Sequence, residues 1–298
     1  MYNAFFGFSE SPFNLSPDPA FFYRSQQHEE ALANLIYGVQ SRKGFIVLTG
    51  EVGTGKTTLL ECLRDYLHSQ RIEFAFLFNS RINPAELFEM IAYDLDLRCD
   101  RSSKTEVLYA LNELLIQQVN EGRTTVLIVD EAHNLEWDVL EEIRMLGNLE
   151  NRTGKMIQVI LAGQPEFDRK LDAPNLRQLK QRVVLRCNLR PFSELETIEY
   201  IESRLAKAGM PDQTLFPPDM LAEIHVRSQG IPRLINAICD NLLLTTFALE
   251  TRATTLEMLD EVTTDMRLEW PGRRLRTRGP AALPEDAASF RPTFSRGD

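Results

Sequence analysis

The chain alternates between short apolar runs and longer stretches in which apolar side chains recur with helical spacing. Residues 45–49 form an unbroken run of apolar or β-branched residues that stops at Gly50. In the preceding residues 26–40, apolar side chains lie three and four positions apart, which is typical of one face of an α-helix. By the same criteria we predict strands at 74–78, 125–129, 156–162 and 183–189, with helices at 84–97 and 107–119.

Near-continuous apolar strands that alternate with helices predict a parallel sheet covered on both faces. We therefore expect an α/β domain with five parallel strands in residues 31–190. Strand signals cease after Pro191, and residues 191–269 predict a small all-helical domain with helices at 195–208, 218–228, 232–249 and 256–268. Residues 270–298 have no apolar period, so we expect a flexible tail rich in arginine and proline.

Residues 1–30 are rich in aromatic side chains and proline. A free tail would expose these rings to water, which is unfavourable. We expect this segment to lie across the domain formed by residues 31–190 and to bury its rings there.

Composition excludes several classes of protein. The 298 residues are 43% hydrophobic and 26% charged, as in ordinary globular proteins and unlike disordered or collagen-like chains. Four cysteines without a C-x-x-C pair indicate neither a zinc ribbon nor a disulfide framework, and they fit a reducing compartment. No apolar run approaches the roughly 20 residues of a membrane-spanning helix, and the first residues do not resemble a secretory signal. We expect a cytoplasmic protein.

The formal charge of −10 disfavours a general nucleic-acid coat but leaves room for a local basic groove. The charge is unevenly distributed, because residues 266–298 hold seven arginines and four acidic residues. The four histidines share no ligand spacing, so the sequence predicts no metal other than magnesium.

The strongest motif follows the first predicted strand. Residues 50–57 read Gly-Glu-Val-Gly-Thr-Gly-Lys-Thr, which matches G-x-x-x-x-G-K-[ST] between a strand and a helix. Such a loop folds around phosphate with its N–H groups inward, at the positive end of the following helix. Lys56 is then expected to contact the β- and γ-phosphates of ATP, and the Thr57 hydroxyl to ligate Mg²⁺. The residues predicted to bind nucleotide in this loop are Gly50, Glu51, Val52, Gly53, Thr54, Gly55, Lys56, Thr57 and Thr58.

A second motif ends the predicted strand 125–129 with two carboxylates, Asp130 and Glu131. Asp130 is placed to hold Mg²⁺, and Glu131 to orient or activate the attacking water, because phosphoryl transfer depends on positioning and electrostatics. The two motifs together predict an ATPase. Residues 130–133 also spell DEAH, as in some helicases, but such a helicase needs a second α/β lobe that the helical residues after Leu189 do not supply.

Further polar residues follow later strands. Gln164 follows the strand at 156–162 and is a candidate sensor of the γ-phosphate and the attacking water; the alternative is an ordinary turn residue. Arg182, and in second place Arg177, are candidate arginine fingers for a neighbouring subunit's nucleotide, or else part of a solvated basic helix face. Arg233 opens the helix at 232–249, where it could reach phosphate or form a structural ion pair.

These residues resemble the AAA+ ATPases, and more narrowly the general secretion pathway protein A family. The resemblance spans about residues 1–250. It rests on the aromatic opening with Pro12-Phe13 and Pro17-Asp18-Pro19, the phosphate loop, Asp130-Glu131-Ala132 with Asn134-Leu135, Gly163-Gln164-Pro165-Glu166, Leu176 to Arg182, Tyr200 to Gly209 and Gly230-Ile231-Pro232-Arg233-Leu234-Ile235-Asn236.

The resemblance implies a P-loop AAA+ core of the ASCE type with a helical lid, and an ATPase that forms homo-oligomers with ATP at subunit boundaries. It also implies an envelope partner: secretion relatives help to assemble an outer-membrane secretin, and similar stand-alone ATPases are associated with exopolysaccharide and protein-sorting systems. Such a protein would be cytoplasmic and reach the inner membrane through its partner. The residues at 12–19 would lie near the adenine.

Two departures from the family stand out. His133 occupies a position where relatives usually have glutamine. The membrane-spanning and peptidoglycan-binding regions of full secretion relatives are not found in this sequence, which argues for a stand-alone form whose membrane part a separate chain could supply.

Two other functions remain open. One is a DNA-binding AAA+ regulator of the transposition or replication-initiation type, which the arginines of the tail favour and the acidic balance disfavours. The other is a nucleotide switch that does not hydrolyse ATP, which the intact Lys56, Asp130 and Glu131 disfavour.

Overall fold

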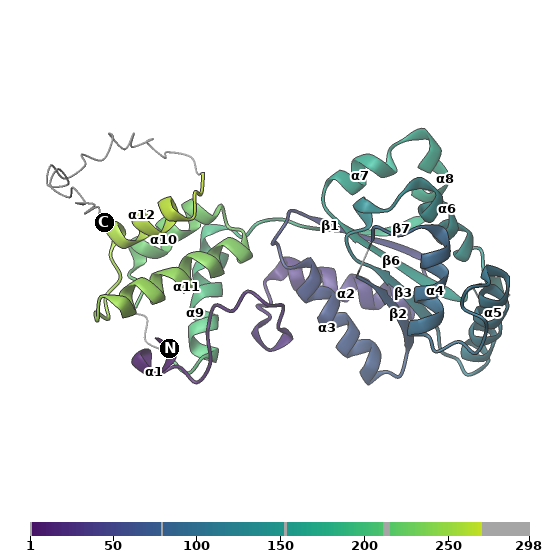
Figure 1. Cartoon of the computed structure of the whole chain (residues 1–298), viewed down its shortest axis with the longest axis horizontal. Helices are drawn as coiled ribbons and strands as arrows, with labels where there is room; N and C mark the ends of the chain where they lie inside the picture. The colour runs from purple at the N-terminus through teal and green to yellow at the C-terminus, as the bar shows by residue number, and fades with distance from the viewer. Residues whose placement is uncertain (1, 79, 152–153, 211–214, 270–298) are drawn as a thin grey trace, which may run out of the picture.

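A computed structural model describes residues 2–78, 80–151, 154–210 and 215–269. A sheet with its covering helices lies at one end of the molecule and a group of helices at the other (Figure 1). The predicted tail, residues 270–298, lies outside the described residues.

Five strands form one parallel sheet in the order β2-β3-β6-β1-β7. This confirms the predicted five-stranded parallel sheet. Because β6 separates β1 from β3, the residues that follow these three strands meet at one edge of the sheet. The strands are β1 (Phe45–Gly50), β2 (Glu73–Leu77), β3 (Thr125–Val129), β6 (Ile157–Gly163) and β7 (Val183–Leu189).

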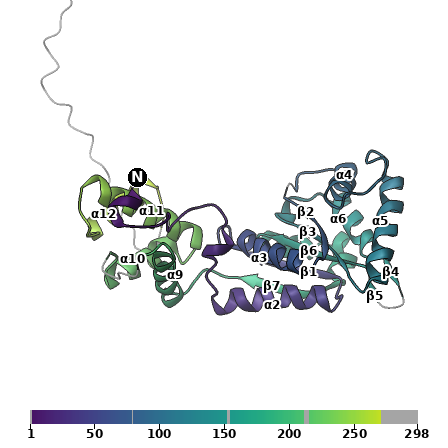
Figure 2. The same ribbon diagram turned by 90° about the horizontal axis from the view of Figure 1, so that it is seen from below.

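Helices cover both faces of the sheet, as the alternation of side chains along β1 requires. Ile46 and Leu48 belong to the apolar cluster with α2 and α3, whereas Phe45 and Val47 belong to the cluster with α4, α5 and α6. Figure 2 shows α2 and α4 on opposite sides of the sheet. These helices are α2 (Gln26–Gln40), α3 (Lys56–Ser69), α4 (Pro84–Asp94), α5 (Lys104–Asn120) and α6 (Trp137–Leu146).

Short elements that the sequence did not predict complete this part of the chain. A two-stranded antiparallel hairpin joins β4 (Glu150–Asn151) to β5 (Gly154–Lys155). Two short helices, α7 (Glu166–Leu171) and α8 (Arg177–Lys180), lie between β6 and β7. Two 3-10 turns also lie in this part of the chain, η2 (Ala132–Asn134) directly after Glu131 and η3 (Pro174–Leu176) directly before α8.

The second part is helical, with α9 (Glu194–Lys207), α10 (Pro218–Ser228), α11 (Pro232–Ala248) and α12 (Leu256–Asp265). Ser193 and Glu196 form a capping box at the start of α9, and proline occupies the first turn of α10 and of α11. Side chains of all four helices share one hydrophobic cluster. Among the described residues, none of the helices has the length and apolar character needed to cross a membrane.

The N-terminal segment does not lie where its sequence led us to expect. It contains α1 (Tyr2–Phe6) and η1 (Pro19–Phe21), and its rings Tyr2, Phe6, Phe8 and Phe13 belong to the cluster of the helical part. Phe13 is fully buried, with its ring centroid 6.1 Å from that of Phe216.

The expectation that these rings pack on residues 31–190 is therefore wrong. Phe22, near the end of the segment, packs against the cluster of α2 and α3. The reason is that burial of apolar surface has no direction of its own, so an aromatic segment does not specify which of two apolar surfaces it covers.

Candidate nucleotide site

The loop between β1 and α3 has a backbone that only glycine adopts easily. Gly53 has φ +84° and Gly55 has φ +97°, both in the left-handed region. At Gly50 the constraint is space, because a Cβ atom there would lie 2.6 Å from the Leu189 carbonyl oxygen. The glycines of the motif are thus required by the shape of the loop.

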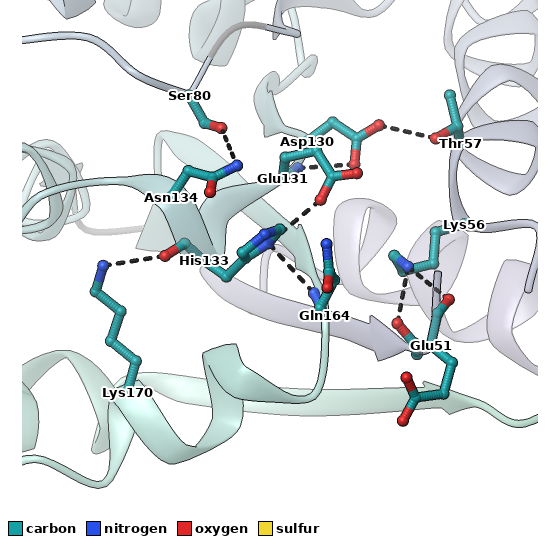
Figure 3. Close-up of polar contacts among 11 residues, drawn as sticks. Glu51, Lys56, Thr57, Ser80, Asp130, Glu131, His133, Asn134, Gln164 and Lys170 are labelled. Atoms are coloured by element: carbon teal, nitrogen blue, oxygen red, sulfur yellow. Dashed lines mark hydrogen bonds and ion pairs between the residues drawn. The ribbon is translucent and has the colours of Figure 1, made fainter. Parts of the chain in front are cut away.

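Lys56 is a buried cation inside this loop. Lys56 is only 5% exposed. Its Nζ donates to the carbonyl oxygens of Gly50 at 2.8 Å and Glu51 at 3.0 Å (Figure 3). Burial lowers the pKa of Lys56, and the nearby carboxylates, Glu131 first, oppose that shift. A buried ammonium group held on backbone carbonyls can exchange them for a stronger acceptor such as phosphate.

Thr57 and Asp130 form an oxygen pair beside Lys56. The Thr57 hydroxyl lies 3.0 Å from Asp130 Oδ2, and the backbone N–H of Glu131 donates to Oδ1 at 2.8 Å. Asp130 is 6% exposed, and burial raises its pKa although both hydrogen bonds and Lys56 act in the opposite direction. A hydroxyl and a carboxylate are hard oxygen donors of the kind Mg²⁺ prefers, so the pair fits that ion.

Glu131 has a strained backbone and a partly buried carboxylate. Its φ of +53° places a non-glycine residue in the left-handed region, which recurs at functional sites. Within the described part of the chain, Glu131 Oε2 is buried without a hydrogen-bond partner, and His133 Nδ1 lies 3.2 Å away. The backbone N–H of Gln164 points at the same nitrogen at 3.4 Å (Figure 3).

The structure therefore gathers the main predicted residues at one edge of the sheet. Lys56 and Thr57 follow β1, Asp130 and Glu131 follow β3, and Gln164 follows β6 between them. Figure 3 shows their side chains around one space.

The two candidate fingers do not join this group. Arg182 is partly buried, and its Nη1 donates to the carbonyl oxygen of Arg144 at 2.9 Å. Arg177 is exposed at the start of α8.

Arg233 brings the helical part into contact with the loop. Its backbone N–H donates to the Gly53 carbonyl oxygen at 3.2 Å, and a Cβ atom on Gly53 would lie 2.8 Å from Arg233 Cβ. The first turn of α11 therefore packs directly on the phosphate loop, while the Arg233 residue itself remains exposed.

Sequence reasoning missed His28, which also contacts the loop. His28 Nε2 lies 2.9 Å from the Thr54 carbonyl oxygen. The available signal was a serine three residues before a histidine at a helix start, since Ser25 is the N-cap of α2. It also missed Asp168, whose carboxylate accepts from the Thr49 hydroxyl at 2.9 Å and pairs with Arg186; no sequence signal marked that contact.

A cavity of about 790 Å³ lies where the N-terminal segment meets the helical part. Pro12 and Phe13, which the resemblance placed near the adenine, are buried. The residues that line the cavity come from the end of the segment, the connection to α9, and α9 and α10, among them Tyr23, Ser25, Phe192, Glu196 and Gln229.

Comparisons with known proteins agree with this geometry. Residues 39–171 match the family model described as AAA domain. General secretion pathway protein A of Aeromonas hydrophila is 43% identical over 249 residues, which are 83% of this chain and 45% of that protein. The chain thus spans less than half the length of this relative.

Solved structures show the same fold. Cdc6p from Pyrobaculum aerophilum superimposes with a TM-score of 0.68 at 22% identity, over 87% of this chain and 71% of that one. The ORC2 protein of Aeropyrum pernix, in its ADPNP–ADP complexes, gives 0.62 at 17% identity, over 84% and 72%. The chain accordingly contains an AAA domain with a P-loop fold, and 83% of this chain is related in sequence to general secretion pathway protein A.

Proposed function

We propose that the chain binds ATP with Mg²⁺ in the loop Gly50–Thr58 and hydrolyses it to ADP and phosphate. The observation that carries the proposal is the convergence of Lys56, the Thr57–Asp130 pair and Glu131 at one sheet edge. A phosphate-binding loop alone would fit a nucleotide switch. A carboxylate held beside the oxygen pair adds a group that can act on water.

Each residue then has a distinct role. Lys56 and the loop N–H groups bind the phosphates, and Arg233 reaches them from α11. Thr57 and Asp130 hold Mg²⁺, which when bound neutralises phosphate charge. Glu131 orients the attacking water and accepts its proton, and Gln164 contacts the γ-phosphate and that water.

We further propose that hydrolysis takes place in a homo-oligomer. Arg182, or else Arg177, supplies positive charge to the nucleotide of a neighbouring subunit. The support is that both arginines lie outside the chain's own group of site residues.

The relationship to general secretion pathway protein A favours work on an envelope secretion or polysaccharide- or protein-export system through a protein partner. We place such a protein in the cytoplasm, at the inner membrane when bound to its partner. The alternative, a DNA-binding regulator, is favoured by the arginines near the end of the chain. Most of these arginines lie at residues 270–298, outside the described residues.

The test is ATP turnover by the purified protein at physiological salt, with and without duplex DNA, and with Glu131→Gln as the blank. Slow Mg²⁺-dependent turnover without DNA stimulation supports the proposal. Turnover equal to that of the blank contradicts hydrolysis, and strong stimulation by DNA favours the DNA-binding regulator.

A further inference from the structure

His28 lies at the junction between the phosphate loop, the N-terminal segment and the helical part. It occupies the first turn of α2 and is only 3% exposed. Its Nδ1 lies 2.7 Å from the Ser25 hydroxyl, and its Nε2 lies 2.9 Å from the Thr54 carbonyl oxygen. Both ring nitrogens therefore have a partner.

These partners determine where the ring carries its proton. A carbonyl oxygen only accepts, so Nε2 must be the protonated nitrogen that donates to Thr54. Burial lowers the pKa of His28, which favours the neutral ring. In the neutral ring Nδ1 is an acceptor, and the Ser25 hydroxyl donates to it. We assign the tautomer from this network.

The contact fixes the orientation of one peptide in the phosphate loop. The Thr54 carbonyl and the Gly55 N–H belong to the same peptide, which is planar and trans, as are all peptides between described residues. In a trans peptide these two bonds point in opposite directions. Because His28 holds the carbonyl, the Gly55 N–H points away from His28.

The ring also packs closely on the loop. A Cβ atom on Gly55 would lie 3.2 Å from His28 Nε2, at a φ of +97° that other residues rarely adopt. Thr54 itself is fully buried. The position of this part of the loop thus depends on the position of the imidazole.

Aromatic contacts connect the same ring to both parts of the molecule. The Phe22 ring lies 5.8 Å from the His28 ring and packs against the cluster of α2 and α3. The Phe192 ring lies 5.5 Å away and belongs to the cluster of the helical part. Phe192 also donates its N–H to the Gly230 carbonyl oxygen at 2.8 Å, just before α11 begins.

We infer that His28 is a positioning residue for nucleotide binding. It holds the Thr54–Gly55 peptide with the Gly55 N–H turned toward the phosphates, and it makes this orientation depend on how Phe192 and the helical part are packed. The inference rests on the proposed binding of ATP at this loop.

The experiment compares His28→Leu with His28→Gln. Leucine removes the donor to Thr54, whereas the glutamine amide can donate from nearly the position of Nε2. We expect His28→Leu to raise the KM and the Kd for ATP about tenfold with a smaller change in kcat. The reason is that the contact stabilises bound ATP to the same extent in the ground state and in the transition state. His28→Gln should recover most of the affinity.

Two further variants keep the test decisive if His28→Leu does not fold. Ser25→Ala removes the hydrogen bond to His28 Nδ1 but leaves the contact between Nε2 and Thr54. It should raise the KM for ATP by a smaller factor than His28→Leu does. His68→Leu replaces an exposed histidine at the end of α3 and should leave KM unchanged.

The outcomes separate this inference from the proposed function. If ATP binds and Lys56→Ala abolishes binding, but His28→Leu, His28→Gln and Ser25→Ala bind ATP like the original protein, only the inference is overturned. Equal losses in His28→Leu and His28→Gln would also overturn it, since they would indicate a packing role. Absence of ATP binding in the unmodified protein would contradict the proposed function itself.

Discussion

Nδ1 of His133 lies 3.2 Å from Glu131 Oε2 and 3.4 Å from the backbone nitrogen of Gln164. One nitrogen cannot both accept from the Gln164 N–H and donate to the Glu131 carboxylate. When Nδ1 carries a proton, it can donate to the Glu131 carboxylate. When Nδ1 carries no proton, it can accept from the Gln164 N–H. His133 therefore influences where Glu131 points.

Replacing His133 tests this influence. His133→Leu removes the ring nitrogen that lies 3.2 Å from Glu131 Oε2 and should lower kcat by about 10–100-fold with little change in KM, because small misplacements of a catalytic group are costly. His133→Gln retains a polar group and should stay closer to the original protein. Steady-state ATPase kinetics measure both, and equal kcat values in the two variants would refute the role.

Lys56 and Glu131 should separate binding from hydrolysis. Lys56→Ala removes the buried cation of the loop and should abolish nucleotide binding. Glu131→Gln should bind ATP normally, fail to hydrolyse it and accumulate as an ATP-bound oligomer. Isothermal titration and light scattering measure the two effects. Normal ATP affinity in Lys56→Ala would contradict the first expectation.

Asp130 should cost the ligand-free protein stability at neutral pH. Burial raises its pKa, so the stabilisation from this group is complete below pH 3.8 and is lost as the pH rises through the folded-state pKa. Asp130→Asn removes the charge and should raise the Tm at pH 7, on a scale of about 2–4 °C per kcal/mol.

The measurement is thermal unfolding without nucleotide at pH 5 and pH 8. The Tm of Asp130→Asn should exceed that of the original protein at pH 8 by at least as much as at pH 5. Asp65→Asn, at an exposed position on α3, is the matched control. Mg²⁺ and ATP should then raise the Tm of the original protein but not that of Asp130→Asn. A lower Tm for Asp130→Asn at pH 8 would show that its hydrogen bonds outweigh its burial.

Mixing experiments should identify the arginine finger. Arg182→Ala and Asp130→Asn should each be inactive alone, and their mixture should recover turnover at interfaces that join an intact finger to an intact site. The same mixture with Arg177→Ala tests the second candidate. Arg182→Ala also loses the hydrogen bond to the Arg144 carbonyl oxygen. Its free energy of unfolding should therefore fall by about 0.5–1.5 kcal/mol, which a lower Tm would report. Lack of recovery in proven mixed oligomers would exclude action between subunits.

Arg233→Ala should weaken the coupling between ATP and the helical part. The backbone contact with Gly53 survives this change, so the effect reports on the guanidinium group. We expect a higher KM and a lower kcat, with Arg267→Ala, an exposed arginine after α12, as the control. Kinetics equal to those of the original protein would rule out a contact between Arg233 and phosphate.

The parts of the fold that sequence predicted are those with local patterns. The sheet and α2 follow from period and turn residues, and the residues of the Lys56 and Asp130 motifs meet because parallel strands share one carboxyl edge. The helix α6 was missed although Val139, Leu140 and Ile143 have helical spacing and are buried.

Contacts between distant segments were not predictable in this way. His28 meets Thr54 across 26 positions, and its neighbour Phe192 is far along the chain. Nothing in the residue types specifies such a pairing, because it depends on how the two clusters are placed. The same reason explains why the rings of the N-terminal segment were assigned to the wrong part of the molecule.

That placement gives the chain an order of events during its synthesis. The Tyr2 hydroxyl pairs with Asp240, 238 positions later, and Phe5 packs on Phe247. At a translation rate of about 5–20 residues per second, these rings wait about 10–50 s for their partners to be made. All strands of the sheet have emerged before then. The rings of Tyr2 and Phe5 therefore reach their final positions only after the sheet has been made, and until then the nascent chain presents them to whatever binds exposed apolar surface.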